Sequence, residues 1–214
     1  MTKTDTQLKN ENLSNRQHDP CKLILVDCDG VICDWEWAFD IWMQEHGFVQ
    51  AANSKLSYDM SIRYNTTQEQ IIKLIRIFNE SAAIGFLPAL RDAVYYVKRL
   101  HEEHGYVFHC ITSLSMDINA QRLRKMNLRK LFGATVFEKI VCLDTGADKS
   151  EALAEYANSN CYWFEDKPEN ADLGHAMGLR SILMEHGHNM DHECPYPKVK
   201  NWRDAYTLIT GQSA

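Results

Sequence analysis

The chain lacks a long apolar run near its beginning. The longest early one covers only residues 23–26 and is ended by Asp27. A bilayer-spanning helix needs about 20 apolar residues, so we expect no membrane partner. The first twenty residues also lack the apolar stretch of a secretory signal and are rich in Thr, Asn, Gln and Asp. We therefore expect residues 1–20 to form a mobile, solvated arm.

Positive charge is also in short supply. Lys and Arg total 23 against 29 Asp and Glu, which gives a formal net charge of −6. Binding to a nucleic-acid backbone needs clustered positive charge, so we do not expect nucleic acid as a partner. One basic stretch keeps a polynucleotide end open as an alternative. It lies on the expected outer side of a helix over 120–131 and consists of Arg122, Arg124, Lys125, Arg129 and Lys130.

The seven cysteines are an odd number and include no CxxC pair. Cys110, Cys142 and Cys161 lie in or beside apolar runs, where cysteine is usually a small buried hydrophobe. We therefore expect a reducing, cytoplasmic location. No repeat, low-complexity tract or long linker divides the 214 residues, which can bury one substantial core with a small inserted lobe. The sequence carries no indication of oligomeric state.

Short apolar runs recur along the chain, each followed by polar or acidic residues. Helical periodicity lies between them, as in the stripe formed by Leu90, Val94 and Val97. Uninterrupted apolar strands that alternate with helices indicate a parallel sheet covered on both faces. We therefore predict an α/β, Rossmann-like three-layer fold with strands in 22–26, 106–111, 140–143, 161–164 and 180–184.

Residues 34–85 interrupt this alternation. Asp34 begins an aromatic helix that stops near Gly47, and Thr66 or Thr67 caps a second helix. Two helices between the first strand and its return helix indicate a helical cap over one end of the sheet. We expect the cap to span 34–85 and the core to comprise 21–33 and 86–214.

The first strand delivers two carboxylates, Asp27 and Asp29, to its carboxyl end, and Gly30 follows. Ligands of open α/β sheets bind at that edge. An Asp-Gly turn after a buried strand is the alternative interpretation, since both residues are common in turns. The motif alone does not separate the two readings.

Polar residues also follow the next three strands. Thr112 and Ser113 end the second, Lys149 follows the third, and the pair Glu165-Asp166 ends the fourth. Lys149 at a helix start opposes the helix dipole unless an anion compensates. Taken singly, Lys149 is better read as a solvated lysine and Glu165-Asp166 as a charged turn. The ordered set favours one site at the carboxyl edge of the sheet.

These motifs, in this order over residues 22–184, resemble those of the haloacid dehalogenase-like hydrolase superfamily, with the cap inserted after the first motif. The second aspartate, Asp29, is a feature of its phosphatase members. A looser resemblance is to the 5′(3′)-deoxyribonucleotidases. It rests on the acid-aromatic step Asp34-Trp35 and on the tail over 195–202, although Glu165 stands where that group has an aspartate.

The resemblance implies that Asp27 is a nucleophile that forms an aspartyl-phosphate and that Asp29 is a general acid and base. It implies a metal ion held by Asp27, the Asp29 carbonyl oxygen and Asp166, with Glu165 bound directly or through water. Hard oxygen ligands and a phosphate substrate favour Mg²⁺. The residues implied to bind the phosphoryl oxygens are Thr112, Ser113 and Lys149.

We therefore expect a Mg²⁺-dependent phosphatase of a small phosphorylated metabolite, with a nucleoside monophosphate as the first substrate. Trp35 and Phe39 are candidates for stacking on the substrate, although aromatic stripes usually form cores. The alternatives are a sugar-phosphate or polynucleotide end-phosphatase and a catalytically silent binding module. A receiver domain fits poorly, because the lysine here precedes the last acidic strand. The histidines and Cys194 of residues 186–194 fit no standard zinc spacing.

Overall fold

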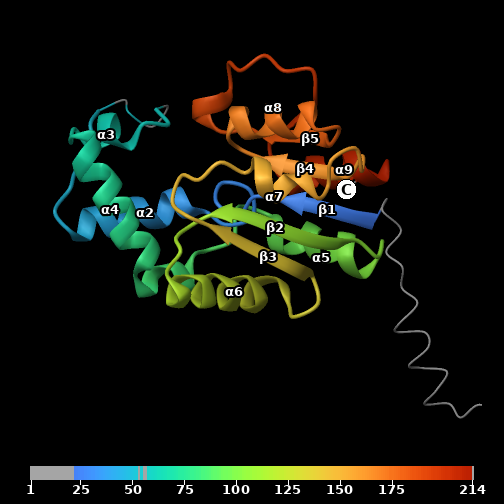
Figure 1. The fold of residues 1–214 in the computed structure, drawn as a ribbon, viewed down its shortest axis with the longest axis horizontal. Helices are drawn as coiled ribbons and strands as arrows, with labels where there is room; N and C mark the ends of the chain where they lie inside the picture. The colour runs from blue at the N-terminus through green and yellow to red at the C-terminus, as the bar shows by residue number, and fades with distance from the viewer. Residues whose placement is uncertain (1–21, 53, 55–56, 214) are drawn as a thin grey trace, which may run out of the picture.

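The computed structural model describes residues 22–52, 54 and 57–213 (Figure 1). The expected arm over 1–20 lies outside the described residues. Within them, six strands form one parallel sheet in the order β3-β2-β1-β4-β5-β6. Each of the first five strands overlaps most of one predicted strand. The short β6 was not predicted. The strands are β1 (Leu23–Val26), β2 (Val107–Ser113), β3 (Phe137–Leu143), β4 (Tyr162–Glu165), β5 (Arg180–Met184) and β6 (Lys198–Val199).

Helices cover both faces of the sheet, because successive strand side chains point to opposite sides. Ile24 and Val26 of β1 belong to a large hydrophobic cluster with residues of α5 (Ala93–Glu102), α6 (Ile118–Phe132) and α9 (Trp202–Thr210). Leu25, between them, packs in a second cluster with α7 (Ser150–Ala154). On the same side, α8 (Pro168–Ala176) packs against β4 and β5. The fold is the predicted three-layer α/β architecture (Figure 1).

A group of helices between β1 and α5 lies at one end of the sheet (Figure 1). They are α2 (Trp35–Glu45), α3 (Met60–Arg63), α4 (Gln68–Glu80) and η3 (Ala82–Phe86). The Asp34 carboxylate caps α2 and the Thr67 hydroxyl caps α4, and α3 is an element that the sequence pattern did not indicate. Buried residues of α2 and α4 share the large cluster with β1. We retain the division into core and cap as a proposal.

The order of the strands determines where the acidic residues meet. β1 lies between β2 and β4, and Val26 pairs with Phe164, so the residues that follow both strands lie side by side. The connections from these strands run to opposite faces, which opens a crevice at their carboxyl ends. Among the helices of the described residues, none has the length and apolarity needed to cross a bilayer.

Candidate active site

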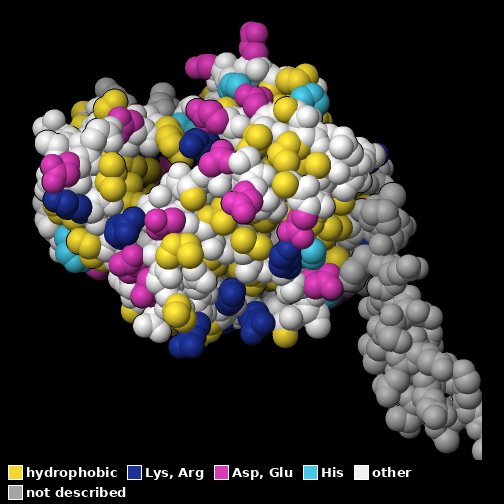
Figure 2. Space-filling view, in the orientation of Figure 1, with side chains coloured by type: hydrophobic (Ala, Val, Ile, Leu, Met, Phe, Trp, Pro, Cys, Tyr) yellow, Lys and Arg dark blue, Asp and Glu magenta, His cyan; other side chains and the backbone are white. Residues whose placement is uncertain are grey.

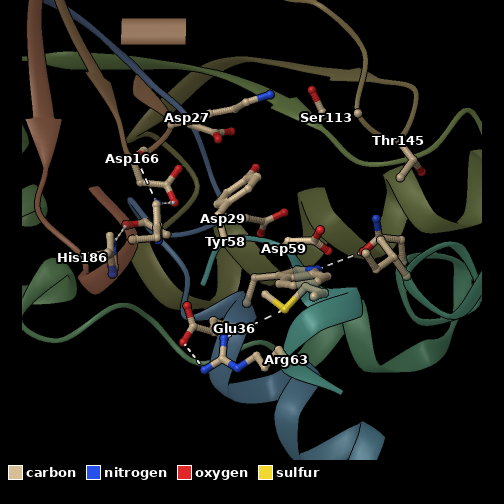
Figure 3. A pocket seen from close by; sticks show the side chains of 18 of the residues that line it. Asp27, Asp29, Glu36, Tyr58, Asp59, Arg63, Ser113, Thr145, Asp166 and His186 are labelled. Atoms are coloured by element: carbon tan, nitrogen blue, oxygen red, sulfur yellow. Dashed lines mark hydrogen bonds and ion pairs between the residues drawn. The ribbon is translucent and has the colours of Figure 1, made fainter. Parts of the chain in front are cut away.

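A cleft of about 780 Å³ lies at the carboxyl edge of the sheet, and residues of α2, α3 and α4 line its other wall (Figure 3). In Figure 2 the surface is hollowed between this group of helices and the sheet. The core contributes five of the predicted site residues, and the opposite wall carries aromatic and polar side chains. The predicted residues that line the cleft are Asp27, Asp29, Ser113, Lys149, Asp166 and Trp35.

Asp27 lies directly after β1 with only 9% of its surface exposed. Its Oδ1 accepts hydrogen bonds from the backbone N–H of Cys28 at 2.6 Å and from Lys149 Nζ at 2.9 Å. Burial raises the pKa of the Asp27 carboxyl to about 8, and the Lys149 ammonium offsets part of that rise. A cation near Asp27 would favour its ionised form further.

Lys149 joins two carboxylates at the wall of the cleft. Its Nζ lies 2.6 Å from Glu165 Oε1 as well as 2.9 Å from Asp27, and the lysine and the glutamate are both buried. Lys149 stands at the N-cap of α7, where the helix dipole disfavours a cation. The two anions supply the compensation that this position requires.

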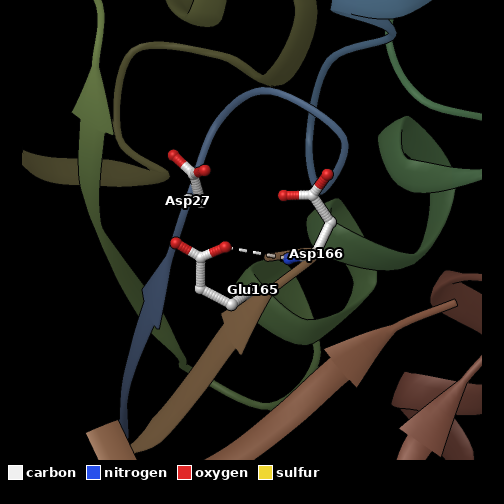
Figure 4. Close-up of side chains that lie close together, drawn as sticks. All are labelled: Asp27, Glu165 and Asp166. Atoms are coloured by element: carbon white, nitrogen blue, oxygen red, sulfur yellow. Dashed lines mark hydrogen bonds between the residues drawn. The ribbon is translucent and has the colours of Figure 1, made fainter. Parts of the chain in front are cut away.

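Glu165 has both carboxylate oxygens occupied. Oε1 accepts from Lys149 and from Asn170 Nδ2, and Oε2 accepts from the backbone N–H groups of Asp166 and Lys167 at 3.0 and 2.9 Å. Figure 4 shows its bond to the Asp166 backbone beside Asp27. Glu165 therefore orients Lys149 and the loop that carries Asp166.

Asp27, Glu165 and Asp166 form the one group of metal-ligand type among the described residues, with ligand atoms within 4.8 Å of one another (Figure 4). Burial and the two neighbouring carboxylates raise the pKa of Asp166 well above its usual value. A divalent cation would relieve this repulsion, and oxygen ligands suit Mg²⁺. The absence of a side chain at Gly30 leaves space for the Asp166 carboxylate, since a Cβ there would lie 2.3 Å from Asp166 Oδ2. The residues present fit the predicted cation.

Asp29 forms an ion pair with Arg124 of α6 through two hydrogen bonds. Nη1 lies 2.5 Å from Oδ1 and Nη2 lies 3.0 Å from Oδ2. The expectation that Arg124 lies on the outer side of its helix is wrong, because its side chain is fully buried. The spacing that could have revealed this is local: Ala120 and Leu128, four residues to either side, are buried on the same face.

The two predicted hydroxyl residues differ in position. Ser113 lines the cleft, and its Oγ donates to the Ala147 carbonyl at 3.0 Å. Thr112 is fully buried, its Oγ1 has no hydrogen-bond partner among the described residues, and it does not line the cleft. Alternation along β2 turns neighbouring side chains to opposite faces, so only one of the two can open to the cleft.

The aromatic candidates differ in the same way. Trp35 lines the cleft, and its Nε1 donates to Asn79 Oδ1 at 2.9 Å. Phe39 is fully buried and stacks on Trp35 at 4.7 Å, so the assignment of Phe39 to substrate contact is wrong. Trp37, which the sequence reasoning left unassigned, lines the cleft with 55% of its surface exposed.

Three further residues line the cleft, Tyr58, His186 and His188. Sequence reasoning gave Tyr58 no role and considered the two histidines only as zinc ligands. His186 Nε2 lies 2.6 Å from the Gly30 carbonyl, and a carbonyl only accepts, so Nε2 carries a proton. His188 Nε2 likewise donates to the Asp166 carbonyl at 3.2 Å, and its ring contacts Tyr58. The two histidines hold the loops that carry the acids. In the described residues they form no metal cluster with Cys194.

The turn after β1 has a second support. The indole Nε1 of Trp202 donates to the Val31 carbonyl at 2.8 Å, and the Trp202 side chain is fully buried. The backbone N–H of Trp202 is in turn held by Asp92 at 3.0 Å. Gly30, with φ +75°, and Val31 are thus fixed from the C-terminal part of the chain.

Comparison with solved structures agrees with this fold. A haloacid dehalogenase-like hydrolase from Streptococcus pneumoniae superposes with a TM-score of 0.60 at 16% identity, over 90% of this chain and 99% of that one. The hydrolase YfnB from Bacillus subtilis, bound to magnesium, gives 0.57 at 15% over 88% and 98%. A heptose 1,7-bisphosphate phosphatase from B. bronchiseptica, complexed with magnesium and phosphate, gives 0.55 at 12% over 88% and 97%.

Comparison of sequences finds fewer similarities than comparison of structures. No protein-family model matches the chain. An uncharacterized 32.4 kDa protein of Enterobacteria phage T4 is 28% identical over 146 residues, which are 65% of this chain and 52% of that protein. The chain thus spans about half the length of this curated relative. The strand order, the acidic edge and the superpositions together show that the chain has the fold of the haloacid dehalogenase-like hydrolases, as its motifs predict.

Proposed function

We propose that the protein is a Mg²⁺-dependent phosphatase that hydrolyses small phosphate monoesters through an aspartyl-phosphate on Asp27. The observation that carries this proposal is the contact of Asp27 with Lys149 beside the carboxylate of Asp166. A buried carboxylate held next to an ammonium group and a site for a cation can approach a phosphate dianion without prohibitive repulsion.

Two displacements describe the reaction. In the first, an Asp27 oxygen forms a bond to phosphorus, the bond to the ester oxygen breaks, and Asp29 gives its proton to the leaving oxygen. In the second, a water oxygen attacks phosphorus, Asp29 takes a proton from that water, and the bond to Asp27 breaks to release phosphate. Asp29 lines the cleft, and burial raises its pKa to about 6 while Arg124 lowers it, so both protonation states are accessible near neutral pH.

The remaining residues bind and orient the phosphoryl group. We assign Lys149 and Ser113 to its oxygens, because both line the cleft, and drop Thr112 from direct contact. The ion would be held by Asp27, Asp166 and the Asp29 carbonyl oxygen. It would stabilise charge on the phosphoryl oxygens. We place Glu165 behind Lys149, since four hydrogen bonds already occupy its oxygens.

For the substrate we retain a nucleoside monophosphate as the first choice. The exposed indole of Trp37 and the ring of Trp35 on the far wall suit a planar group. Sugar phosphates are the second choice, since the similar structures include a heptose bisphosphate phosphatase. A polynucleotide end is less favoured: exposed basic side chains do line the α6 edge (Figure 2), but Arg124 is withdrawn from them. The free state of the described cysteines supports a reducing, cytoplasmic location.

A phosphate-release screen tests this proposal. The purified protein is assayed with Mg²⁺ against nucleoside monophosphates, sugar phosphates and phospholipid-precursor phosphates, with Asp27→Asn as the control. We expect turnover that needs both Mg²⁺ and Asp27, highest on nucleotides. A preference for sugar phosphates would overturn the nucleotide choice alone. Silence across the panel would favour the binding module.

A further inference from the structure

The contact between Arg124 and Asp29 has features that simple charge neutralisation does not require. The guanidinium of Arg124 is fully buried under the cleft floor, whereas 21% of the Asp29 side chain is exposed and lines the cleft. Both carboxylate oxygens are engaged, by Nη1 and Nη2. Nη1 also approaches the Cys28 sulfur. The arginine thus holds Asp29 from behind and leaves its front open to a ligand.

The two-point geometry fixes more than charge. A guanidinium fork sets both the position and the plane of the carboxylate it binds, whereas a single ammonium would leave the plane free to turn. Each carboxylate oxygen has two lone pairs, and Arg124 uses one on each oxygen. One lone pair on each oxygen is left over, and Asp29 lines the cleft.

We propose that Arg124 is a positioning residue that fixes the Asp29 carboxyl for proton transfer to the leaving oxygen. This inference rests on the proposed phosphatase function, in which Asp29 supplies that proton. Arg124 does not line the cleft and would act only through Asp29. Its loss would let the Asp29 side chain rotate, which lengthens the path of the proton without removing the Asp27 nucleophile.

The inference predicts a dependence on the leaving group. An alkoxide needs a proton as the P–O bond breaks, whereas 4-nitrophenolate leaves without one. The ratio kcat/KM reports only the steps up to formation of the aspartyl-phosphate, so it isolates the first proton transfer. Loss of Arg124 should therefore affect alkyl esters and spare the aryl ester.

The experiment measures kcat/KM for 4-nitrophenyl phosphate and glycerol phosphate with Mg²⁺. For Arg124→Met we expect a fall of about 100-fold on the alkyl ester and less than about threefold on the aryl ester. Arg124→Lys should show the same pattern, because a single ammonium does not fix the plane. Arg122→Met removes an exposed arginine from the same helix and should change neither value.

Asp29→Asn provides an independent measure. Arg124→Met added to Asp29→Asn should lower alkyl-ester activity less than about twofold further, since the two residues act as one unit. Thermal melts of every variant separate misfolding from lost positioning, and Arg124→Lys serves if Arg124→Met does not fold. Equal losses on both esters in a folded variant would overturn the inference and leave the phosphatase function intact. A wild-type protein inactive on both esters would overturn both.

Discussion

Gly30 and Asp166 lie against each other at the edge of the carboxylate cluster, although they follow different strands of the sheet. A Cβ on Gly30 would stand 2.3 Å from Asp166 Oδ2 and 2.6 Å from its Cγ. Gly30 also has a φ of +75°, which side-chain-bearing residues rarely adopt. The glycine is therefore required both by its own backbone and by the acid beside it.

Gly30→Ala is accordingly expected to displace the Asp166 carboxylate. Left-handed backbone strain and overpacking together should cost about 2–4 kcal/mol in the free energy of unfolding. Gly105→Ala is the matched control, because Gly105 has a φ of +71° and no atom within 4 Å of the added Cβ. It should lose about 1 kcal/mol from strain alone. Urea unfolding measures both, and equal losses would contradict the contact with Asp166.

Asp27→Asn should abolish phosphatase turnover while the fold persists. Loss of an essential nucleophile lowers kcat by at least about 10⁴-fold. The amide is nearly the same size, and the backbone N–H of Cys28 can still find an oxygen. Phosphate release measures the loss of turnover, and a thermal melt measures whether the fold persists. Steady-state activity above the background of a mock purification would refute the role of Asp27 as nucleophile.

Magnesium should raise the melting temperature of the wild-type protein. Cations that bind only the folded chain stabilise it by about 2.7 kcal/mol at 100 times Kd. Asp166→Asn removes one of the three clustered carboxylates and should abolish most of the shift, whereas Asp191→Asn changes an exposed acid outside that cluster and should keep it. Melts with Mg²⁺ or EDTA provide the comparison. An undiminished shift in Asp166→Asn would place the ion elsewhere.

The pH dependence of stability should reflect His109 of β2, which does not line the cleft. Burial lowers its pKa below the usual 6.5, and Glu138 offsets part of the change. Tyr156, Lys139 and Glu155 also face the ring. Below pH 6.5 the unfolded chain takes up more protons at this position, so His109 favours unfolding increasingly as the pH falls. The free energies of unfolding of wild type and His109→Gln, measured by urea titration, should therefore become more similar as the pH falls from 7.5 to 5.5.

The strand ends could be predicted because each is a local pattern, an apolar run followed at once by polar residues. Sheet topology then brought Asp27, Lys149, Glu165 and Asp166 together without further information. Arg124 could not be placed in this way. Its partner Asp29 is 95 residues away in the chain, and a run of basic residues resembles a solvated helix face.

Phe39 was misplaced for a related reason. Helical spacing gives the angle of a side chain around its helix, but the element packed against that helix decides whether the side chain is covered. Phe78 of α4 covers Phe39 in edge-on contact at 5.3 Å, and Trp37 on the same helix stays exposed. The two residues of β6 are too few for any periodicity to be visible.

The supports of the Gly30-Val31 turn bear on when this site comes into being during synthesis. His186 holds the Gly30 carbonyl and Trp202 holds the Val31 carbonyl, so two late segments of the chain secure the first motif. A ribosome that has released residues 1–185 has delivered both aspartates, the lysine and the acidic pair, yet neither of these contacts. Segments that emerge after the acidic pair thus complete the turn that follows β1.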